Sequence, residues 1–364
     1  MTPRRLIAYT HARDDPAARF RIRQFIPRFE RAGWSVSHRT NHPERPWQSP
    51  FSAQSARWVH QHAGVAVRRL WRRWDIRAAA AFDVAFVNRD LLEGRVAYEA
   101  ALLRRNARVV FDFDDAIHLG RKEAHVAWIC AHAAWVTAGN ALLAHVARRY
   151  TDRVSVVPTV VDTDTYSAPA DPREDGPLRL GWLGSDLSIR ETLFPFLPTL
   201  AALQQAIGFE FVVVSKPRPN LPSSPLRWRF VEWNPEVETR IAGLFDVGIM
   251  PLEDNAFQRG KCGCKLLQYM AAGLPAVASP VGVNARLLDD GRGFLANDRD
   301  AWGAALMRLR DTALRREQGA AARRFVEREY SVTAWFPHLL DIVESVRVGE
   351  RPDGAGVRAS ENGG

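Results

Sequence analysis

The feature that most constrains this chain is a regular alternation of short apolar runs with longer helical stretches, which occurs twice. The apolar runs are rich in β-branched and aromatic residues, as strands are, and stretches such as ALLAHVARRY between them have a helical period. The runs cover residues 5–10, 34–40, 82–88, 108–115, 134–139 and 153–159, and then 178–184, 209–215, 229–233, 246–252, 275–279 and 293–297. This pattern predicts an α/β protein with two doubly wound parallel sheets.

The chain divides between the two series of strands. A length of 364 residues suits two domains, and the segment DTDTYSAPADPREDGP has the composition of an interdomain connection, so we expect a boundary near Tyr166. We therefore expect a Rossmann-like domain over residues 1–165 and a second over 166–332. A further helix is predicted at 333–348, and a Gly-rich, disordered tail at 349–364.

The net charge of +9 is concentrated in the first half. Residues 1–165 carry 26 Lys and Arg against 16 Asp and Glu, whereas residues 166–364 carry 24 against 25. The first domain is therefore expected to meet an anionic partner, either a phosphorylated ligand, a membrane surface or a nucleic acid. The chain has no helix-turn-helix, zinc-finger or aromatic RNA-binding signature, and we expect no nucleic-acid partner.

Other sequence signals restrict the protein class. No run reaches the roughly 18 apolar residues that span a bilayer, and the first residues do not form a secretory signal, so a cytoplasmic location is expected. The three cysteines lack a CxxC pair, which predicts free thiols and no zinc site. No GxGxxG or Walker A pattern is present, which argues against nicotinamide, flavin and P-loop enzymes.

The segment RGKCGCKLLQYMAAGLPAVAS, residues 259–279, carries the strongest chemical signal. A Gly-punctuated basic loop leads into a predicted helix, and the N-terminus of a helix attracts phosphate. Gly263 allows close approach of a ligand, Lys261 adds charge, and Lys265 and Gln268 share one helical face. The segment therefore predicts a diphosphate site, with an ordinary surface turn before an amphipathic helix as the alternative.

Four further residues are expected on the same ligand side of the second domain. GWLGS places Gly184 and Ser185 in the turn after the first strand, where backbone and hydroxyl groups would donate to phosphate. Arg190 begins the next helix and Lys216 follows the next strand, so both would neutralise a leaving diphosphate. Solvated surface cations are the alternative interpretation of these two.

The order GWLGS, DVGIMPL and GKCGCKLLQYMAAGLPAVASPVGVN, preceded by AGN and VVPTVVDTDTY, resembles retaining group 1 (family 4) glycosyltransferases of the GT-B fold. The resemblance implies two Rossmann-like domains facing across a cleft and a final helix that crosses back to the N-terminal domain. It also implies a nucleotide-sugar donor held mainly by the C-terminal domain, retention of anomeric configuration, and no metal ion or other cofactor.

The chain departs from that family at two positions. The family often carries a Glu-x7-Glu pattern, and here Gly260 and Gln268 occupy the two glutamate positions. Gln268 can still hydrogen-bond a hydroxyl group, and Glu253 or Asp254 would have to replace the first carboxylate. The departure leaves open a catalytically degenerate homologue that binds a sugar nucleotide or a polysaccharide.

In the first domain, FDFDDAIH gathers ionisable groups at the end of a predicted strand. Asp112 is expected to bind acceptor hydroxyl groups, and Asp114, Asp115 and His118 are candidate catalytic groups that remove the acceptor proton. The alternative is that one aspartate caps the following helix.

Two arginine-rich segments complete the candidates. Arg19 and Arg23 are i and i+4 in a predicted helix, so they would grip an acceptor phosphate, with a solvated helix edge as the alternative. Residues 65–78 predict a basic amphipathic helix. Its apolar side would contact a membrane carrying a lipid-linked acceptor, or would pack on the sheet with a charged exterior. The expected function is thus transfer of a sugar from a nucleotide-sugar donor to a glycan, lipid-linked or small-molecule acceptor, as in polysaccharide biosynthesis.

Overall fold

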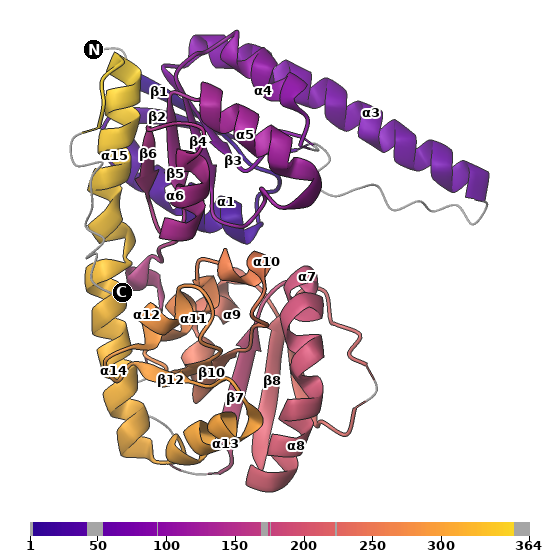
Figure 1. The fold of residues 1–364 in the computed structure, drawn as a ribbon, viewed down its shortest axis with the longest axis vertical. Coiled ribbons are helices and arrows are strands. Elements are labelled where there is room, and N and C mark those ends of the chain that lie inside the picture. The colour runs from indigo at the N-terminus through magenta and orange to yellow at the C-terminus, as the bar shows by residue number, and fades with distance from the viewer. Residues whose placement is uncertain are drawn as a thin grey trace. The chain divides into compact units, whose positions relative to one another are not determined.

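The computed structural model describes residues 3–41, 54–92, 94–168, 174, 176–222 and 224–352. Contacts between residues divide the chain into two compact units. The first unit contains Met1–Thr159 together with Trp335 and the residues after it, and the second is Val160–Ala334. Most of the expected tail, residues 353–364, lies outside the described residues. Each unit is built around one six-stranded sheet (Figure 1).

The sheet of the first unit is parallel throughout, with the strand order β2-β1-β3-β4-β5-β6. Every residue of the central strands β3 and β4 is buried, as expected for a sheet covered on both faces. The strands are β1 (Arg4–Tyr9), β2 (Trp34–Arg39), β3 (Val84–Asn88), β4 (Val109–Phe113), β5 (Trp135–Ala138) and β6 (Val154–Val156).

Helices connect these strands. The longest, α3, extends past the rest of the unit in Figure 1. The helices are α1 (Pro16–Arg21), α2 (Ile26–Arg31), α3 (Gln54–Ala78), α4 (Val96–Leu103), α5 (Glu123–His132) and α6 (Ala141–Arg148), with short 3-10 turns η1 (Arg23–Phe25), η2 (Ala79–Ala81) and η3 (Gly120–Lys122).

The last helix, α15 (Val332–Val348), returns to the first unit (Figure 1). The ring of Phe336 packs edge-on against Phe29, with centroids 5.2 Å apart. Glu344 accepts a hydrogen bond of 3.0 Å from the indole of Trp34 and forms an ion pair with Arg4. These contacts tie the C-terminal helix to β1, β2 and α2, and the expected crossing of this helix is confirmed.

The sheet of the second unit is also parallel, with the strand order β12-β11-β10-β7-β8-β9. Its core includes the fully buried rings of Trp182, Phe211 and Trp302. The strands are β7 (Leu178–Leu183), β8 (Phe209–Ser215), β9 (Trp228–Glu232), β10 (Val247–Met250), β11 (Ala276–Ala278) and β12 (Gly293–Leu295).

The helices of the second unit vary in length from single turns to the long α14. They are α7 (Asp186–Ser188), α8 (Leu197–Ile207), α9 (Pro235–Thr239), α10 (Ala256–Arg259), α11 (Cys264–Ala271), α12 (Asn284–Leu288), α13 (Arg299–Arg308) and α14 (Thr312–Glu329), with short turns η4 (Thr163–Thr165), η5 (Ile189–Leu193), η6 (Phe194–Phe196) and η7 (Ile241–Gly243).

The twelve strands found in the described part of the chain coincide with the predicted apolar runs to within a few residues, and the α/β class with two Rossmann-like units is confirmed. One local prediction is wrong. The helix expected after the first strand breaks at Ile22, whose φ of −140° is not helical, so α1 and α2 are separate helices joined by η1.

Candidate donor and acceptor sites

The candidate donor site lies at the carboxyl edge of the second sheet. Strands β7, β8, β10 and β11 are parallel, so their last residues reach the same edge, where open α/β sheets bind ligands. Two segments meet there, namely residues 184–191 after β7 and the 259–268 loop and helix after β10.

Lys265 connects these two segments directly. Its Nζ donates a hydrogen bond of 2.6 Å to Oγ of Ser188 and lies 5.0 Å from the ring centroid of Trp182. The contact between Lys265 and Trp182 requires a glycine at position 184. A Cβ there would lie 2.5 Å from the Trp182 ring and 2.9 Å from Cε of Lys265. The structure thus brings together Gly184 and Lys265, which the sequence predicted separately.

Lys261 forms a second connection between the same segments. Its Nζ lies 3.6 Å from Oε2 of Glu191 and 4.8 Å from the ring centroid of Phe257. The side chain is only 18% exposed, so its charge is less screened by water than a surface charge would be. Two ammonium groups therefore lie at one edge of the sheet, where both would attract an anionic ligand.

Gly263 sets the start of α11. Its φ of +68° is in the left-handed region, and a Cβ would lie 2.4 Å from Cδ1 of Leu287, so the position requires glycine. Gly263 caps α11 without any side-chain hydrogen bond. The positive end of the helix dipole at α11 adds to the charges of Lys261 and Lys265.

The remaining predicted donor residues lie at the same edge in more exposed positions. Ser185 caps α7 by accepting a hydrogen bond of 3.3 Å from the Ser188 backbone N–H. Arg190 is 64% exposed and pairs with Asp186 at 3.2 Å. Lys216 lies 3.8 Å from Glu232, and both side chains are at least half exposed.

Gln268 is 4% exposed and lies among buried polar groups. It is hydrogen-bonded to Tyr166, whose hydroxyl donates a bond of 2.9 Å to Glu238. Burial, followed by the charge of Glu238, raises the pKa of Tyr166 well above its usual value. Trp233 donates a further bond of 2.7 Å to Glu238. Gln268 is therefore part of the buried interior of the unit. Its neighbour is Tyr166, whereas Lys265 contacts Ser188 and Trp182.

The two carboxylates proposed as replacements for the family's first glutamate are both exposed. Asp254 is engaged by Arg259, whose guanidinium donates hydrogen bonds of 2.5 and 3.0 Å. The hydrogen bond from Arg259 holds the pKa of Asp254 below its usual value. Glu253 lies on the same loop after β10.

In the first unit, Asp112 is fully buried within a network of side chains. Arg21 donates two hydrogen bonds to its carboxylate, of 3.1 and 2.5 Å, and Asn88 and Thr137 donate bonds of 2.8 and 2.7 Å. Arg21 also donates to the carbonyl of Val157 at 2.7 Å. The network joins α1 to β3, β4 and β5, so Asp112, predicted as an acceptor ligand, is already engaged on both oxygens.

Asp114 and Asp115 face Arg89. The guanidinium of Arg89 lies 3.0 Å from Asp114 and 3.7 Å from Asp115. Burial opposes ionisation of Asp114, but the positive charges of Arg89 and Arg21 hold its pKa below the usual value. Asp114 is therefore a carboxylate in an ion pair, which makes it a weak proton acceptor.

His118 differs from the two aspartates. Its Nδ1 is buried and has no hydrogen-bond partner among the described residues. Burial lowers the pKa of the imidazole, so the ring is neutral at pH 7. Of the three predicted catalytic groups, His118 is the one with no ion pair to a described arginine, and its neutral ring can accept a proton.

The arginine clamp predicted from Arg19 and Arg23 does not form on one helical face. The break at Ile22 ends α1, and Arg23 lies in η1. Arg19 stacks over Phe20 at 4.9 Å, while Arg23 donates a hydrogen bond of 2.8 Å to the carbonyl of Arg13. Instead, Arg21 between them makes the buried contact, with Asp112.

The helix expected over 65–78 forms as part of α3. It does not pack its apolar side on the sheet, as the second alternative required. Leu70, Trp71 and Trp74 are 60%, 50% and 70% exposed. Arg72, expected on the charged exterior, is 1% exposed and donates hydrogen bonds to Asn41 and the carbonyl of Thr10. The helix therefore turns an arginine inward and apolar side chains outward.

Sequence reasoning missed several partners of the predicted residues. Arg89 lies directly after buried strand β3 and has a φ of +66°, which is uncommon for a residue other than glycine. Asp90 follows it and is bound by His11 at 2.7 Å and Lys122 at 3.2 Å. The signal was the polar triplet NRD directly after an apolar strand, which places charged side chains at the ligand edge of a parallel sheet.

At the end of β2, His38 contributes another titratable group. Its Nε2 lies 2.8 Å from the hydroxyl of Thr10. Burial, followed by the charge of Arg23, lowers the pKa of His38 to about 4. Within the described ranges of the chain, no cluster of three or more His, Cys, Asp or Glu side chains is arranged to hold a metal ion.

Comparison with known proteins gives a family match over part of the chain and a match of the whole fold. Residues 179–312 match the model of a protein family described as "Glycosyl transferases group 1". The match includes both segments of the candidate donor site. No curated protein matches the chain in sequence.

Solved structures show that the fold is the GT-B fold. Sucrose-phosphate synthase from Thermosynechococcus elongatus superposes with a TM-score of 0.66 at 16% identity, covering 95% of this chain and 100% of its own. A trehalose-phosphate synthase from Burkholderia vietnamiensis gives 0.63 at 12% identity, covering 95% and 98%. HepE from Anabaena, solved with UDP and glucose, gives 0.60 at 13%, covering 94% and 100%.

Proposed function

Because residues 179–312 match the model of group 1 glycosyltransferases and the chain has the GT-B fold, we propose a specific transfer reaction. The protein moves a sugar from a nucleotide-sugar donor to a glycan, lipid-linked or small-molecule acceptor. Anomeric configuration is retained, and no metal ion takes part. The second unit binds the donor and the first unit binds the acceptor.

The observation that carries the proposal is the convergence of Lys261 and Lys265 on the segment after β7. Lys265 contacts Ser188 at 2.6 Å, and Lys261 lies 3.6 Å from Glu191. A nucleoside diphosphate bound there would meet two ammonium groups and the N-terminus of α11. These groups stabilise the negative charge that develops on the diphosphate as its bond to the sugar breaks.

The acceptor hydroxyl loses its proton as its oxygen forms the new bond to the anomeric carbon. His118 is the proposed proton acceptor, because its ring is neutral at pH 7 and its Nδ1 lacks a hydrogen-bond partner in the described structure. Asp114 and Asp115 are then proposed to position the acceptor through Arg89, and Asp112 through Arg21.

A non-catalytic binding protein is the second candidate, and a specific observation favours it. Gly260 and Gln268 replace the family's two glutamates, and Gln268 is buried against Tyr166. Such a protein would bind a sugar nucleotide or a polysaccharide without turning it over.

The first test is the melting temperature of the purified protein with UDP, GDP, ADP and their sugar conjugates, because ligands of the native state raise it. UDP-sugars come first, since the Anabaena protein of the same fold was solved with UDP and glucose. A shift with one nucleotide supports the donor site and identifies the base. The absence of any shift, with and without candidate acceptors, contradicts the proposed function.

Turnover then separates an enzyme from a binding protein. With the nucleotide that binds, release of nucleoside diphosphate is measured with and without EDTA, and the anomeric configuration of the product is read by NMR. Equal rates with EDTA and a retained configuration support the proposal. Tight binding without sugar transfer or donor hydrolysis supports the binding protein instead.

Peripheral contact of residues 65–78 with a membrane also belongs to the proposal. Within the residues that the structure describes, no helix has both the length and the apolar character needed to cross a bilayer. The exposed tryptophans of α3 support contact at the surface of a membrane.

A further inference from the structure

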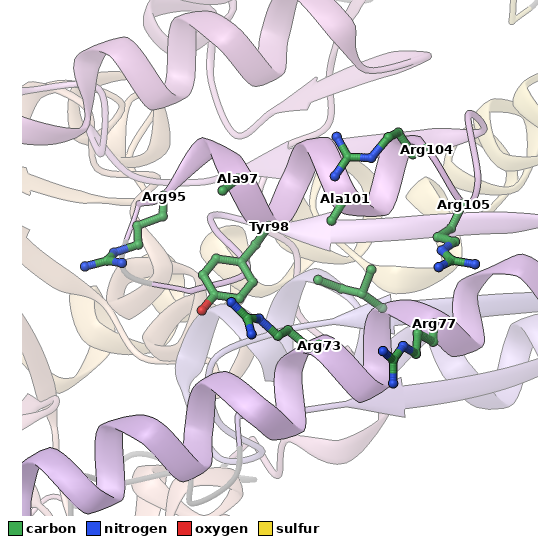
Figure 2. A pocket seen from close by; sticks show the side chains of 9 residues that line it. Arg73, Arg77, Arg95, Ala97, Tyr98, Ala101, Arg104 and Arg105 are labelled. Carbon is green, nitrogen blue, oxygen red and sulfur yellow. The ribbon is translucent and has the colours of Figure 1, made fainter.

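A cavity in the first unit is lined by five arginines that have no part in the donor or acceptor sites. It has a volume of about 410 Å³ and lies between α3 and α4. Figure 2 shows Arg73 and Arg77 on α3, with Arg95, Arg104 and Arg105 at the two ends of α4. The floor between them is apolar, formed by Ile76, Ala97, Tyr98 and Ala101.

Four of the five arginines have no counter-charge among the described residues. No Asp or Glu is among the described residues that line the cavity, and the side chains of Arg73, Arg77, Arg104 and Arg105 make no hydrogen bond or ion pair with any other described residue. Two described carboxylates nearby in sequence contact other groups. Asp75 lies 3.9 Å from buried Arg72, and Glu99 accepts a hydrogen bond from the Leu91 backbone N–H.

Like charges gathered without a counter-charge repel one another, and a bound anion removes that repulsion. The guanidinium group is planar and offers paired N–H donors that match the oxygens of a phosphate. Several arginines around a cavity of this size suit a small phosphorylated group and exclude a nucleic-acid duplex. The chemistry of the ligand is therefore that of a phosphate ester.

The surface beside the cavity indicates where the phosphate is carried. Leu70 and Trp74 are i and i+4 on α3 and are 60% and 70% exposed. Arg73 lies three residues after Leu70, and Arg77 lies three residues after Trp74. The exposed apolar side chains and the arginines are therefore neighbours on the surface of α3. Exposed tryptophans beside arginines are typical of a helix lying at a membrane surface, with its cations at the headgroups.

We propose that the cavity between α3 and α4 binds the phosphate of an anionic membrane lipid, while Leu70, Trp71 and Trp74 enter the interface beside it. This binding anchors the first unit at the surface where lipid-linked acceptors are found. The inference rests on the proposed contact of residues 65–78 with a membrane, and it adds the lipid group that is bound. It does not depend on the glycosyltransferase activity, because neither the cavity nor the exposed apolar residues of α3 include a donor-site residue.

The test is cosedimentation of the full chain with vesicles of phosphatidylcholine alone or with added phosphatidylglycerol. We expect binding to the anionic vesicles, and a loss of roughly tenfold or more in affinity when three cavity arginines are neutralised. The cavity variant is Arg73→Gln, Arg77→Gln and Arg104→Gln.

A matched variant removes the same charge elsewhere on the first unit, at exposed arginines outside the cavity. It carries Arg108→Gln, Arg121→Gln and Arg148→Gln. This control should lose less than about threefold, because bulk charge acts only through screened, long-range attraction. Equal losses in the two variants would overturn the cavity as a binding site.

A third variant, Trp74→Ser, separates a lipid from a soluble phosphate. It should weaken vesicle binding and leave binding of glycerol phosphate, measured by calorimetry, unchanged. Binding of glycerol phosphate with no affinity for anionic vesicles would overturn the membrane assignment. Melting temperatures near the wild-type value establish that each variant is folded, and unchanged donor binding keeps this test separate from the proposed function.

Discussion

The two sheets carry charged groups at the same edge, but they use them differently. In the first unit the charges neutralise one another, with Arg21 bound to Asp112 and Arg89 bound to Asp114. In the second unit, Lys265 contacts a neutral hydroxyl and a ring, and Lys261 lies at 3.6 Å from a single carboxylate. The carboxyl edge of the first sheet, the first edge, is held together by buried or half-buried ion pairs with hydrogen-bond distances. At the carboxyl edge of the second sheet, the second edge, Lys261 has a longer ion pair.

This difference separates stability from binding. A buried and fully hydrogen-bonded ion pair is costly to break, because the remaining charge has no partner. A cation in a long or water-exposed contact contributes less to folding and can exchange that contact for one with a bound anion. Substitutions at the first edge should therefore change mainly stability, and substitutions at the second should change mainly affinity.

The largest effect is expected for Asp112→Ala. It leaves Arg21 buried without its counter-charge and removes the acceptor for Asn88 and Thr137, so the unfolding free energy should fall by about 3–5 kcal/mol. Denaturant titration followed by fluorescence measures it. The control Asp152→Ala breaks an exposed pair with Arg351 and should change little. Equal effects for the two would show that the first edge is not a stabilising network.

At the second edge, Gly263→Ala is expected to lower both the stability of the protein and its affinity for the nucleotide. The left-handed φ and the close contact with Leu287 should together cost about 2–4 kcal/mol and displace the start of α11. Gly243→Ala is the matched control, because a Cβ there meets nothing within 4 Å. A Gly263→Ala variant with normal stability and normal nucleotide affinity would contradict the role given to this turn.

A pH effect on stability is expected from His38 in the first unit. The unfolded His38 takes up its proton near its usual pKa, and the folded one does so at about 4, so the unfolded state binds more protons in between. Stability should fall as the pH is lowered from about 6.5 to 4, by about 2 kcal/mol from this residue. In His38→Gln, the unfolding free energy should depend less on pH between about 6.5 and 4, as measured by denaturant titrations at several pH values. An unchanged slope would contradict the burial of a neutral ring.

The architecture was predictable because the strands are distinct in composition and period. All twelve predicted runs contain a strand, and the Gly-punctuated loop does lead into helix α11. Lysine is rare here, with four lysines among 50 basic residues, so Lys261 and Lys265 in one loop are an informative pair. Their approach to Ser188 and Glu191 required the fold, because it joins segments far apart in sequence.

The sequence could not decide which side of a helix faces the protein. A helical period shows that Leu70 and Trp74 share a face, but it does not tell which face is buried, and Arg72 proved to be the inward residue. In the same way, spacing placed Arg19 and Arg23 together only if the helix continued through Ile22. The helix α1 ends before Ile22, and its last residue, Arg21, pairs with Asp112.

The central claim is that the second edge binds a nucleoside diphosphate through Lys261 and Lys265, and calorimetric titration of the nucleotide tests it most directly. The double variant Lys261→Ala and Lys265→Ala should lose roughly 100-fold or more in affinity, since each charged contact contributes about 1.5–3 kcal/mol. The control Arg259→Ala, which removes an exposed cation of the same loop, should bind like the wild type. Equal affinities in the double variant and the wild type would contradict the account.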